Sequence, residues 1–342
     1  MAGAIARDGS GRDAGWASSR QHIVSFSGNA WIIVGSTLNE VGARGDIPPR
    51  DIRAAVVDTL TGQTVGTRLW PGVIRRKATL LATSDGSFLV RDAQALTLYS
   101  RSFEHMAEIA LPDARPKAFE QWRVFVTPTG KHVVTAHVIG EEIQVNWLDP
   151  VTLRQERVWS LAPEMPRAEV FPELAVSDSS VLLVRSEHGK CQVSVQDGTT
   201  AWHPVVGYDK PCRFGAHFLG QDMLFLPLPQ GFQVLGLDGH VAWQESLPDG
   251  EFVRLVRGSA NGGRIAAPIT AFQGGSSVLD ISSHEVLKRI NIYDIQSKTC
   301  FCRVEKNPGT IAGFALSPDG SKLLALRGSV MELYDLPAWP PR

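Results

Sequence analysis

The sequence predicts an all-β fold built from seven repeats of four short strands. Three observations lead to this prediction. The chain of 342 residues is rich in turn formers, with 32 Gly and 21 Pro. Short apolar runs of strand length alternate with clusters of Ser, Pro, Asp, Asn and Gly along most of it. A strand-ending Asp, or once a Ser, recurs at steps of 41 to 56 residues, and such a period is typical of repeat architectures.

The clearest repeat lies near the C-terminus, over residues 310–336. Its first apolar run ends at the turn SPDG (317–320), the strand KLLAL follows, and the run VMELYD ends at Asp335. In such a turn Pro presets φ, Asp bonds its own backbone and Gly tolerates positive φ. Related turns recur upstream at residues 27–29, 84–86, 128–130, 177–180, 219–222 and 259–262.

The recurring acids end the third strand of each repeat. We interpret them as structural turn residues rather than catalytic acids, because Asp in this place bonds the backbone of the turn that follows. They are Asp58, Asp149, Asp197, Asp238, Asp294 and Asp335, and Ser100 takes the same place in the second repeat. The fourth strands often carry Trp, which we expect to pack between repeats: Trp70, Trp159, Trp202 and Trp243.

Seven such sheets predict a seven-bladed β-propeller. One twisted sheet cannot bury both faces, whereas a ring of sheets buries each face against a neighbour and leaves only short edges. The last repeat shows three strands before the sequence ends. We therefore expect residues 1–20 to supply a closing strand, from part of residues 3–18. Residues 21–337 then form one propeller domain, and residues 338–342 form a tail.

The repeats resemble bacterial WD-repeat-like propellers, including those of the YVTN type. The resemblance is carried by SPDGSKLLAL (317–326), TPTGKHVVTA (127–136) and the strand endings INIYD and MELYD at Asp294 and Asp335. The resemblance covers roughly residues 20–336. It implies a β-propeller architecture and does not imply a particular function. No repeat ends in Trp-Asp and none opens with Gly-His. The resemblance therefore does not imply the Asp-His-Ser-Trp network of eukaryotic WD repeats.

Composition and motifs exclude several functional classes. The 34 Lys and Arg nearly balance the 35 Asp and Glu, which argues against a nucleic-acid partner. The sequence lacks an apolar run of about 18 residues, so we expect no transmembrane helix. It also lacks phosphate-binding glycine motifs, the nucleophile elbow G-x-S-x-G and the zinc motif H-E-x-x-H. We expect no metal and no cofactor, and we interpret Cys300 and Cys302 as buried thiols on one face of a strand.

The first twenty residues contain no apolar stretch of the kind that a secretory signal needs. The sequence as written therefore predicts a cytoplasmic protein, or an exported one if a leader precedes the given start. We expect a monomer.

Acidic side chains are scarce on the predicted innermost strands, where only Glu173 and Asp178 lie at the margins. A hard cation needs several oxygen ligands, so a metal-dependent centre is not expected there. His217 also falls on a predicted inner strand, and we interpret it as structural. A propeller enzyme or small-ligand binder at the channel mouth, lactonase-like or quinoprotein-like, remains the alternative function.

Two loops exceed the repeat, at residues 36–51 and 271–289, and long loops are disproportionately functional. We expect them to rise on either side of the seventh blade and to form a groove for a protein or peptide. The alternative is that each loop packs on its own blade. The second loop is also expected to open a short helix at Ser282. The candidate binding residues are Asn39, Glu40, Arg44, Asp46, Arg50, Asp280, His284, Glu285 and Arg289. The main prediction is thus a non-enzymatic interaction scaffold.

Overall fold

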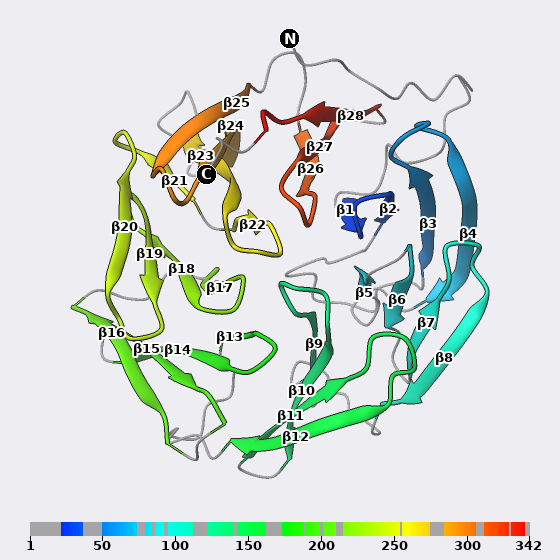
Figure 1. Cartoon of the computed structure of the whole chain (residues 1–342), viewed down its shortest axis with the longest axis horizontal. Coiled ribbons are helices and arrows are strands. Elements are labelled where there is room, and N and C mark those ends of the chain that lie inside the picture. The colour runs from blue at the N-terminus through cyan, green and yellow to red at the C-terminus, as the bar shows by residue number, and fades with distance from the viewer. Residues whose placement is uncertain are drawn as a thin grey trace, which may run out of the picture. The chain divides into compact units, whose positions relative to one another are not determined.

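The structure is a computed structural model of the chain. It describes residues 22–36, 50–73, 79–83, 86–91, 95–111, 122–139, 142–161, 173–187, 189–198, 201–209, 215–253, 255–273, 284–305, 311–327 and 330–338. Within these ranges the regular elements are 28 strands, which form seven antiparallel sheets (Figure 1). The chain divides into two compact units, Met1–Phe171 with Ile311–Arg342, and Pro172–Thr310.

The first unit contains four sheets in which each strand pairs with the next along the chain. The first sheet has β1 (His22–Ser27), β2 (Trp31–Ser36), β3 (Arg50–Asp58) and β4 (Thr64–Val73). The second has β5 (Thr79–Ala82), β6 (Phe88–Arg91), β7 (Ala95–Tyr99) and β8 (His105–Ala110). The third has β9 (Trp122–Val126), β10 (Val133–Ile139), β11 (Glu142–Leu148) and β12 (Gln155–Leu161). The seventh has β26 (Ile311–Leu316), β27 (Lys322–Arg327) and β28 (Val330–Asp335).

The second unit contains three sheets of the same kind. The fourth sheet has β13 (Glu173–Val176), β14 (Val181–Glu187), β15 (Lys190–Gln196) and β16 (His203–Tyr208). The fifth has β17 (His217–Leu219), β18 (Met223–Leu228), β19 (Gly231–Gly236) and β20 (Val241–Ser246). In the sixth, the short β21 (Glu251–Phe252) and β22 (Arg257–Gly258) both pair with β23 (Arg264–Gln273), followed by β24 (His284–Asp294) and β25 (Thr299–Glu305).

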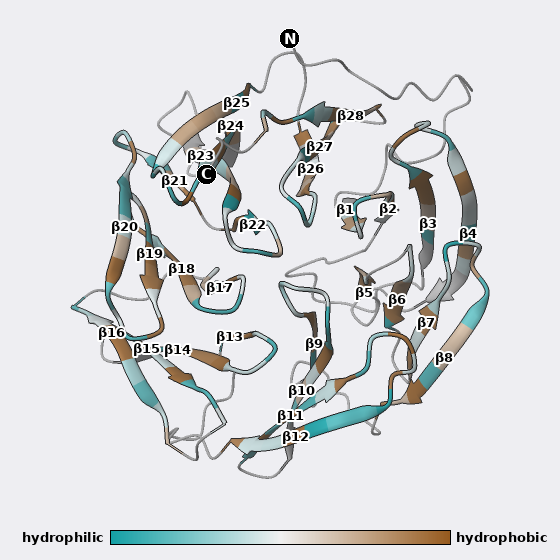
Figure 2. Cartoon of the chain, in the orientation of Figure 1, coloured by the Kyte–Doolittle hydropathy of each residue, from teal (hydrophilic) through white to brown (hydrophobic). Residues whose placement is uncertain are grey.

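Burial follows the position of a strand within its sheet. The second strands β6 and β18 and the third strands β7 and β19 are buried almost without interruption, whereas the outer strand β8 alternates between exposed and half-buried residues. Figure 2 shows the same contrast between the brown β6 and the mostly hydrophilic β12. A strand covered on both faces needs apolar residues throughout, which explains the continuous apolar runs of the sequence.

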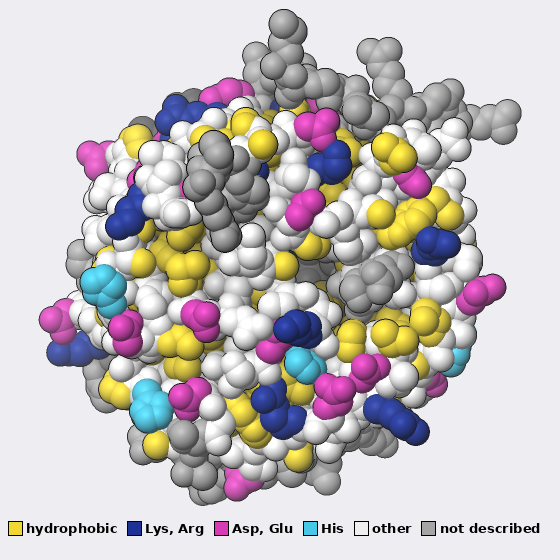
Figure 3. All heavy atoms as spheres, viewed as in Figure 1, with side chains coloured by type: hydrophobic (Ala, Val, Ile, Leu, Met, Phe, Trp, Pro, Cys, Tyr) yellow, Lys and Arg dark blue, Asp and Glu magenta, His cyan; other side chains and the backbone are white. Residues whose placement is uncertain are grey.

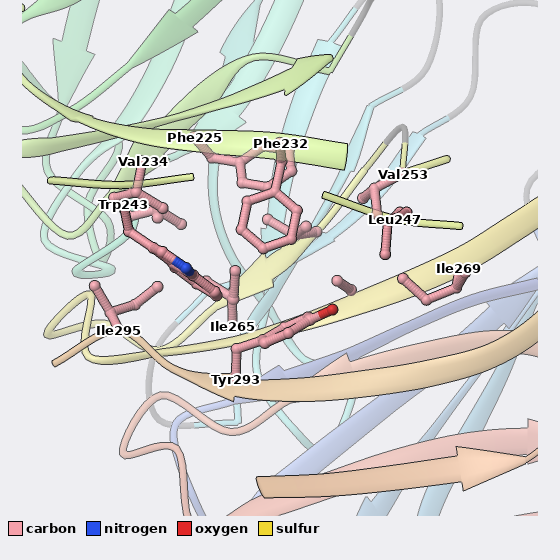
Figure 4. Close-up of a cluster of buried hydrophobic side chains, with 13 residues drawn as sticks. Phe225, Phe232, Val234, Trp243, Leu247, Val253, Ile265, Ile269, Tyr293 and Ile295 are labelled. Carbon is pink, nitrogen blue, oxygen red and sulfur yellow. The ribbon is translucent and has the colours of Figure 1, made fainter. Parts of the chain in front are cut away.

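Neighbouring sheets bury their faces against each other. In the first unit, one cluster joins Phe26 and Val34 of the first sheet to Leu324 and Leu333 of the seventh, and others join the first sheet to the second and the second to the third. In the second unit, clusters join the fourth sheet to the fifth and the fifth to the sixth. Figure 4 shows the last of these, in which Trp243, Phe232 and Tyr293 point toward one another.

The structure corrects the expected arrangement of the two C-terminal cysteines. A β-bulge shifts the register so that Cys300 pairs with Tyr293, whereas Cys302 pairs with Ile292. Adjacent residues of β24 face opposite sides of the sheet, so the bulge places the two thiols on opposite faces rather than on one. Both thiols are free and half-buried.

The seventh sheet has three strands within the described residues. Residues 1–21, to which the closing strand was assigned from the sequence, lie outside the described residues.

Candidate functional site

Each predicted insertion connects two paired strands of one sheet. In the sixth sheet, β23 and β24 stay paired from Arg264 and Asp294 out to Gln273 and His284. In the first sheet the insertion connects β2, which ends at Ser36, to β3, which begins at Arg50, and these two strands pair up to Gly35 and Ala54. The expected helix from Ser282 is wrong for its described part, because His284 and Glu285 already belong to β24 and bond to β23.

A salt bridge braces the middle of the β23–β24 hairpin of the sixth sheet. Arg289 in β24 donates two hydrogen bonds to the carboxylate of Glu251 in β21, at 2.9 and 2.6 Å. Both side chains are largely buried, at 18% and 17% exposure. The hydrogen bonds from Arg289 hold the pKa of Glu251 below its usual value. Because a bidentate pair fixes both distance and orientation, it holds the hairpin against the inner strand of its own sheet.

The structure locates only part of the predicted binding set. Arg50, His284 and Glu285 open strands β3 and β24, and Arg289 is the member whose side-chain contacts are described. The remaining members lie outside the described residues: Asn39, Glu40, Arg44, Asp46 and Asp280. The two insertions belong to different compact units. A groove formed by both therefore remains a prediction.

The strand-ending acids make local contacts in their turns. Asp58 accepts hydrogen bonds from the backbone N–H groups of Leu60 and Thr61 at 2.7 and 2.9 Å. Asp149, Asp238 and Asp294 likewise accept from backbone N–H groups two or three positions on. These bonds stabilise the charged form, so the pKa of Asp58 lies below its usual value, and a bond from the Thr152 hydroxyl does most to lower that of Asp149.

The two remaining strand-ending acids, Asp197 and Asp335, contact side chains. Asp197 lies 4.0 Å from Nε2 of His203, and Asp335 accepts a 2.5 Å hydrogen bond from Nζ of Lys322.

A polar pair lies on the inner strands of the second unit. Oε1 of Glu173 in β13 accepts hydrogen bonds from the backbone N–H groups of Gly215 and Ala216, at 2.5 and 3.1 Å. Nδ1 of His217 in β17 lies 2.8 Å from the carbonyl oxygen of Gly215. Since a carbonyl only accepts, Nδ1 carries the proton. Nε2 of the neutral ring is then a bare acceptor.

Each side chain of this Glu173–His217 pair keeps one buried polar atom without a hydrogen-bond partner, namely Oε2 of Glu173 and Nε2 of His217. Burial raises the pKa of Glu173. Burial, together with the charge of Arg257, lowers the pKa of His217 to about 4, so the imidazole stays neutral at pH 7. Two unsatisfied acceptors on adjacent inner strands could therefore accept from a hydrogen-bond donor. The sequence placed both residues on inner strands, but nothing in it indicated that they share Gly215.

The described residues form no cluster of metal ligands, and the face seen in Figure 3 shows no large patch of one charge. Among the described residues, no three His, Cys, Asp or Glu side chains are grouped closely enough to hold a metal ion. None of the described residues form a helix with the length and apolar character needed to span a membrane. On the face seen in Figure 3, acidic, basic and hydrophobic side chains are interspersed, without a large region of one charge in its described part.

Comparison with known proteins shows the fold. No family model matches the sequence, and no curated protein matches it. Among solved structures 1180 chains match. One of these is the C-terminal WD40 domain of Sif2, with a TM-score of 0.50, 12% identity, and coverage of 93% of this chain and 97% of that chain.

The protein has the fold of a WD40-like seven-bladed β-propeller. The narrower resemblance to bacterial YVTN-type propellers remains a prediction.

Proposed function

We propose that the protein is a non-enzymatic scaffold that binds a protein or peptide through its two insertions, at residues 36–51 and 271–289. The observation that carries this proposal is the β23–β24 hairpin, which stays paired out to Gln273 and His284 and is braced by Arg289 and Glu251. A rigid stem reduces the ordering cost of the segment that it presents, which favours binding. The common use of WD40-like folds as interaction scaffolds supports the same function.

Quantitative affinity capture tests this proposal. The baits are the wild type, the charge-reversed double variant Arg44→Glu/His284→Glu, and a control variant, Asp222→Lys, in an exposed turn far along the chain from both insertions. We expect one or more proteins to be enriched by the wild type and the control and lost by the double variant, with equal melting temperatures for all three. Retention of every partner by the double variant would refute binding through the insertions.

The Glu173–His217 pair favours a second candidate function, a small-ligand site on the inner strands β13 and β17. Its two unpartnered atoms are both acceptors, so the ligand would be a neutral molecule rich in N–H or O–H donors, such as an amide or a polyol. A thermal-shift screen of such compounds tests it. The compounds should raise the melting temperature of the wild type and of Asp222→Lys, but not of Glu173→Gln or His217→Gln. No shift with any compound would remove this candidate.

We also propose that part of residues 3–18 forms the fourth strand of the seventh sheet, beside β28. Within the described residues β28 pairs with β27 alone, and an open sheet edge is normally covered. Deletion of residues 1–20 should therefore lower the melting temperature. An unchanged melting temperature for this truncation would rule out the closing strand.

A further inference from the structure

Arg257 brings a positive charge to the Glu173–His217 pair. It lies on β22, one of the two short inner strands of the sixth sheet, and its charge helps to lower the pKa of His217 on β17. The two strands touch just beyond these residues, since a Cβ on Gly258 would lie 3.2 Å from a methyl carbon of Leu219. Figure 1 shows β13, β17 and β22 next to one another within the second unit. Three inner strands of this unit therefore bring together a carboxyl group, an imidazole and a guanidinium.

The guanidinium of Arg257 has no counter-ion within the described part of the chain. Burial by the surrounding protein lowers its pKa, and no neighbouring charge contributes to that shift. The residue is nevertheless exposed to solvent. A side chain that solvent reaches, but that other protein groups desolvate, lies among those groups rather than on an open surface. An unpaired guanidinium in such a place is suited to a carboxylate, which it can bind through two parallel N–H groups.

The carboxyl group of Glu173 does not serve as that counter-ion. Its Oε1 is held by the backbone N–H groups of Gly215 and Ala216, and its Oε2 is buried without a partner. The charge of Arg257 is not among the causes that shift the pKa of Glu173. The two groups therefore flank His217 without pairing with each other. A ligand that lies between them meets two bare acceptors at one end and a cation at the other.

We propose that this site binds the zwitterion of a neutral amino acid, with its ammonium group at Glu173 and His217 and its carboxylate at Arg257; the inference rests on the small-ligand site proposed above as the second candidate. The ammonium group has three N–H donors, and Oε2 of Glu173 and Nε2 of His217 accept two of them. The carboxylate accepts a bidentate pair of hydrogen bonds from the guanidinium. Such a ligand is neutral overall and rich in N–H donors, as the two acceptors require.

Ligands that carry only one of the two charges fit the site less well. An amine without a carboxylate leaves Arg257 unpaired and adds a second positive charge beside it. An acid without an amine leaves the buried acceptors of Glu173 and His217 unsatisfied and brings a negative charge toward a carboxyl group. Because an unpaired charge or buried polar atom is costly, both classes should bind more weakly than the zwitterion.

Matched ligands test the assignment. The neutral L-amino acids are screened one by one for a rise in the melting temperature of the wild type, and at least one should raise it. The strongest is then compared, by isothermal titration calorimetry, with the amine that lacks its carboxylate and the acid that lacks its ammonium group. L-serine, ethanolamine and 3-hydroxypropionate form one such set. Each analogue should bind at least about tenfold more weakly, as expected for loss of a charge-assisted contact.

Matched variants assign the carboxylate to Arg257. Arg257→Gln should weaken binding of the amino acid by about tenfold, whereas Arg257→Lys, which keeps the charge, should lose less. Lys190→Gln is the control, because it removes a positive charge from an exposed position of the same unit, and should bind as the wild type does. Equal affinity for the amino acid and both analogues, or unchanged affinity in a folded Arg257→Gln variant, overturns the inference.

The same screen separates this inference from the small-ligand site on which it rests. If amides or polyols raise the melting temperature through Glu173 and His217 but no neutral amino acid does, the site stands and the zwitterion falls. If no compound of either class raises it, both fall. Inorganic phosphate that binds through Arg257 more tightly than every amino acid would assign a simple anion site and overturn the zwitterion.

Discussion

The backbone N–H of Asp319 donates a 3.1 Å hydrogen bond to Oδ1 of Asn29, although 290 positions separate the two residues. Asn29 lies in the turn after β1, and Asp319 lies in the turn after β26. The same two sheets share the apolar cluster that contains Phe26 and Leu324. The first and last repeats of the chain are therefore joined within one compact unit by both a polar and an apolar contact.

Removal of the Asn29 side chain should weaken this junction slightly. Asn29→Ala leaves the Asp319 amide to water, because the site is exposed, and should cost at most about 1 kcal/mol of folding free energy. Hydrogen exchange of the 317–321 turn, measured by mass spectrometry, should become faster. Unchanged exchange in that turn would show that the bond does not protect it.

The Arg289–Glu251 pair should contribute more to stability than an exposed pair. Arg289→Ala leaves a largely buried carboxylate without its donor, so we expect a loss of about 2 kcal/mol in chemical denaturation. Lys190→Ala is the matched control, because its pair with Asp209 is as short, at 2.8 Å, but highly exposed, and should cost less than about 0.5 kcal/mol. Equal losses for the two variants would contradict the bracing role.

His217 should make the fold sensitive to acid. The pKa of its imidazole is about 4 in the folded protein and 6.5 in the unfolded chain. Between these two pH values the unfolded chain therefore binds a proton at this side chain, whereas the folded chain does not. Stability therefore falls by about 2 kcal/mol from pH 7 to pH 5.

The neighbouring groups of His217 define the control for this prediction. Glu173 has a raised pKa and opposes the effect, since its protonated form is favoured in the fold, whereas Arg257 supports it by disfavouring the imidazolium. His217→Gln should lose less melting temperature than the wild type over the same pH range. An identical pH profile would exclude His217 as its source.

Gly231 should tolerate no side chain. A Cβ there would lie 1.9 Å from the carbonyl oxygen of Glu245, and the residue has a φ of 128°. We expect Gly231→Ala to destabilise by more than about 3 kcal/mol or to prevent folding, because backbone must move. Gly250→Ala is the control: its φ of 79° is also positive but nothing lies within 4 Å, so it should cost about 1 kcal/mol. Similar losses of stability for Gly231→Ala and Gly250→Ala would show that the positive φ, and not the contact with Glu245, causes the loss.

Thiol titration should distinguish the cysteines. Cys191 is disulfide-bonded, Cys300 and Cys302 are free, and the fourth cysteine of the sequence, Cys212, lies outside the described residues. Denatured, unreduced protein should therefore show two reactive thiols per chain, and reduced protein four. Four thiols without reductant would disprove the disulfide, and a disulfide persists mainly in an oxidising compartment.

The sequence predicted the strands better than their side-chain contacts. The predicted inner strand HIVSFS is β1, and the turn at 317–320 forms as its chemistry requires, with Gly320 at a φ of 72°. The helix at Ser282 was wrong because strand pairing with β23 continues to His284, and local capping signals are weaker than a paired strand. The common face of Cys300 and Cys302 was wrong because a bulge, which the pattern of two cannot show, shifted the register.

By itself the sequence determined the repeat, the strand order and the strand-ending acids, because strand alternation and turn chemistry act between residues close along the chain. Tertiary structure alone brought Glu251 to Arg289, Glu173 and His217 to the two sides of Gly215, and Asn29 to Asp319. These pairs lie on different strands or sheets, and their distances depend on the packing of whole sheets.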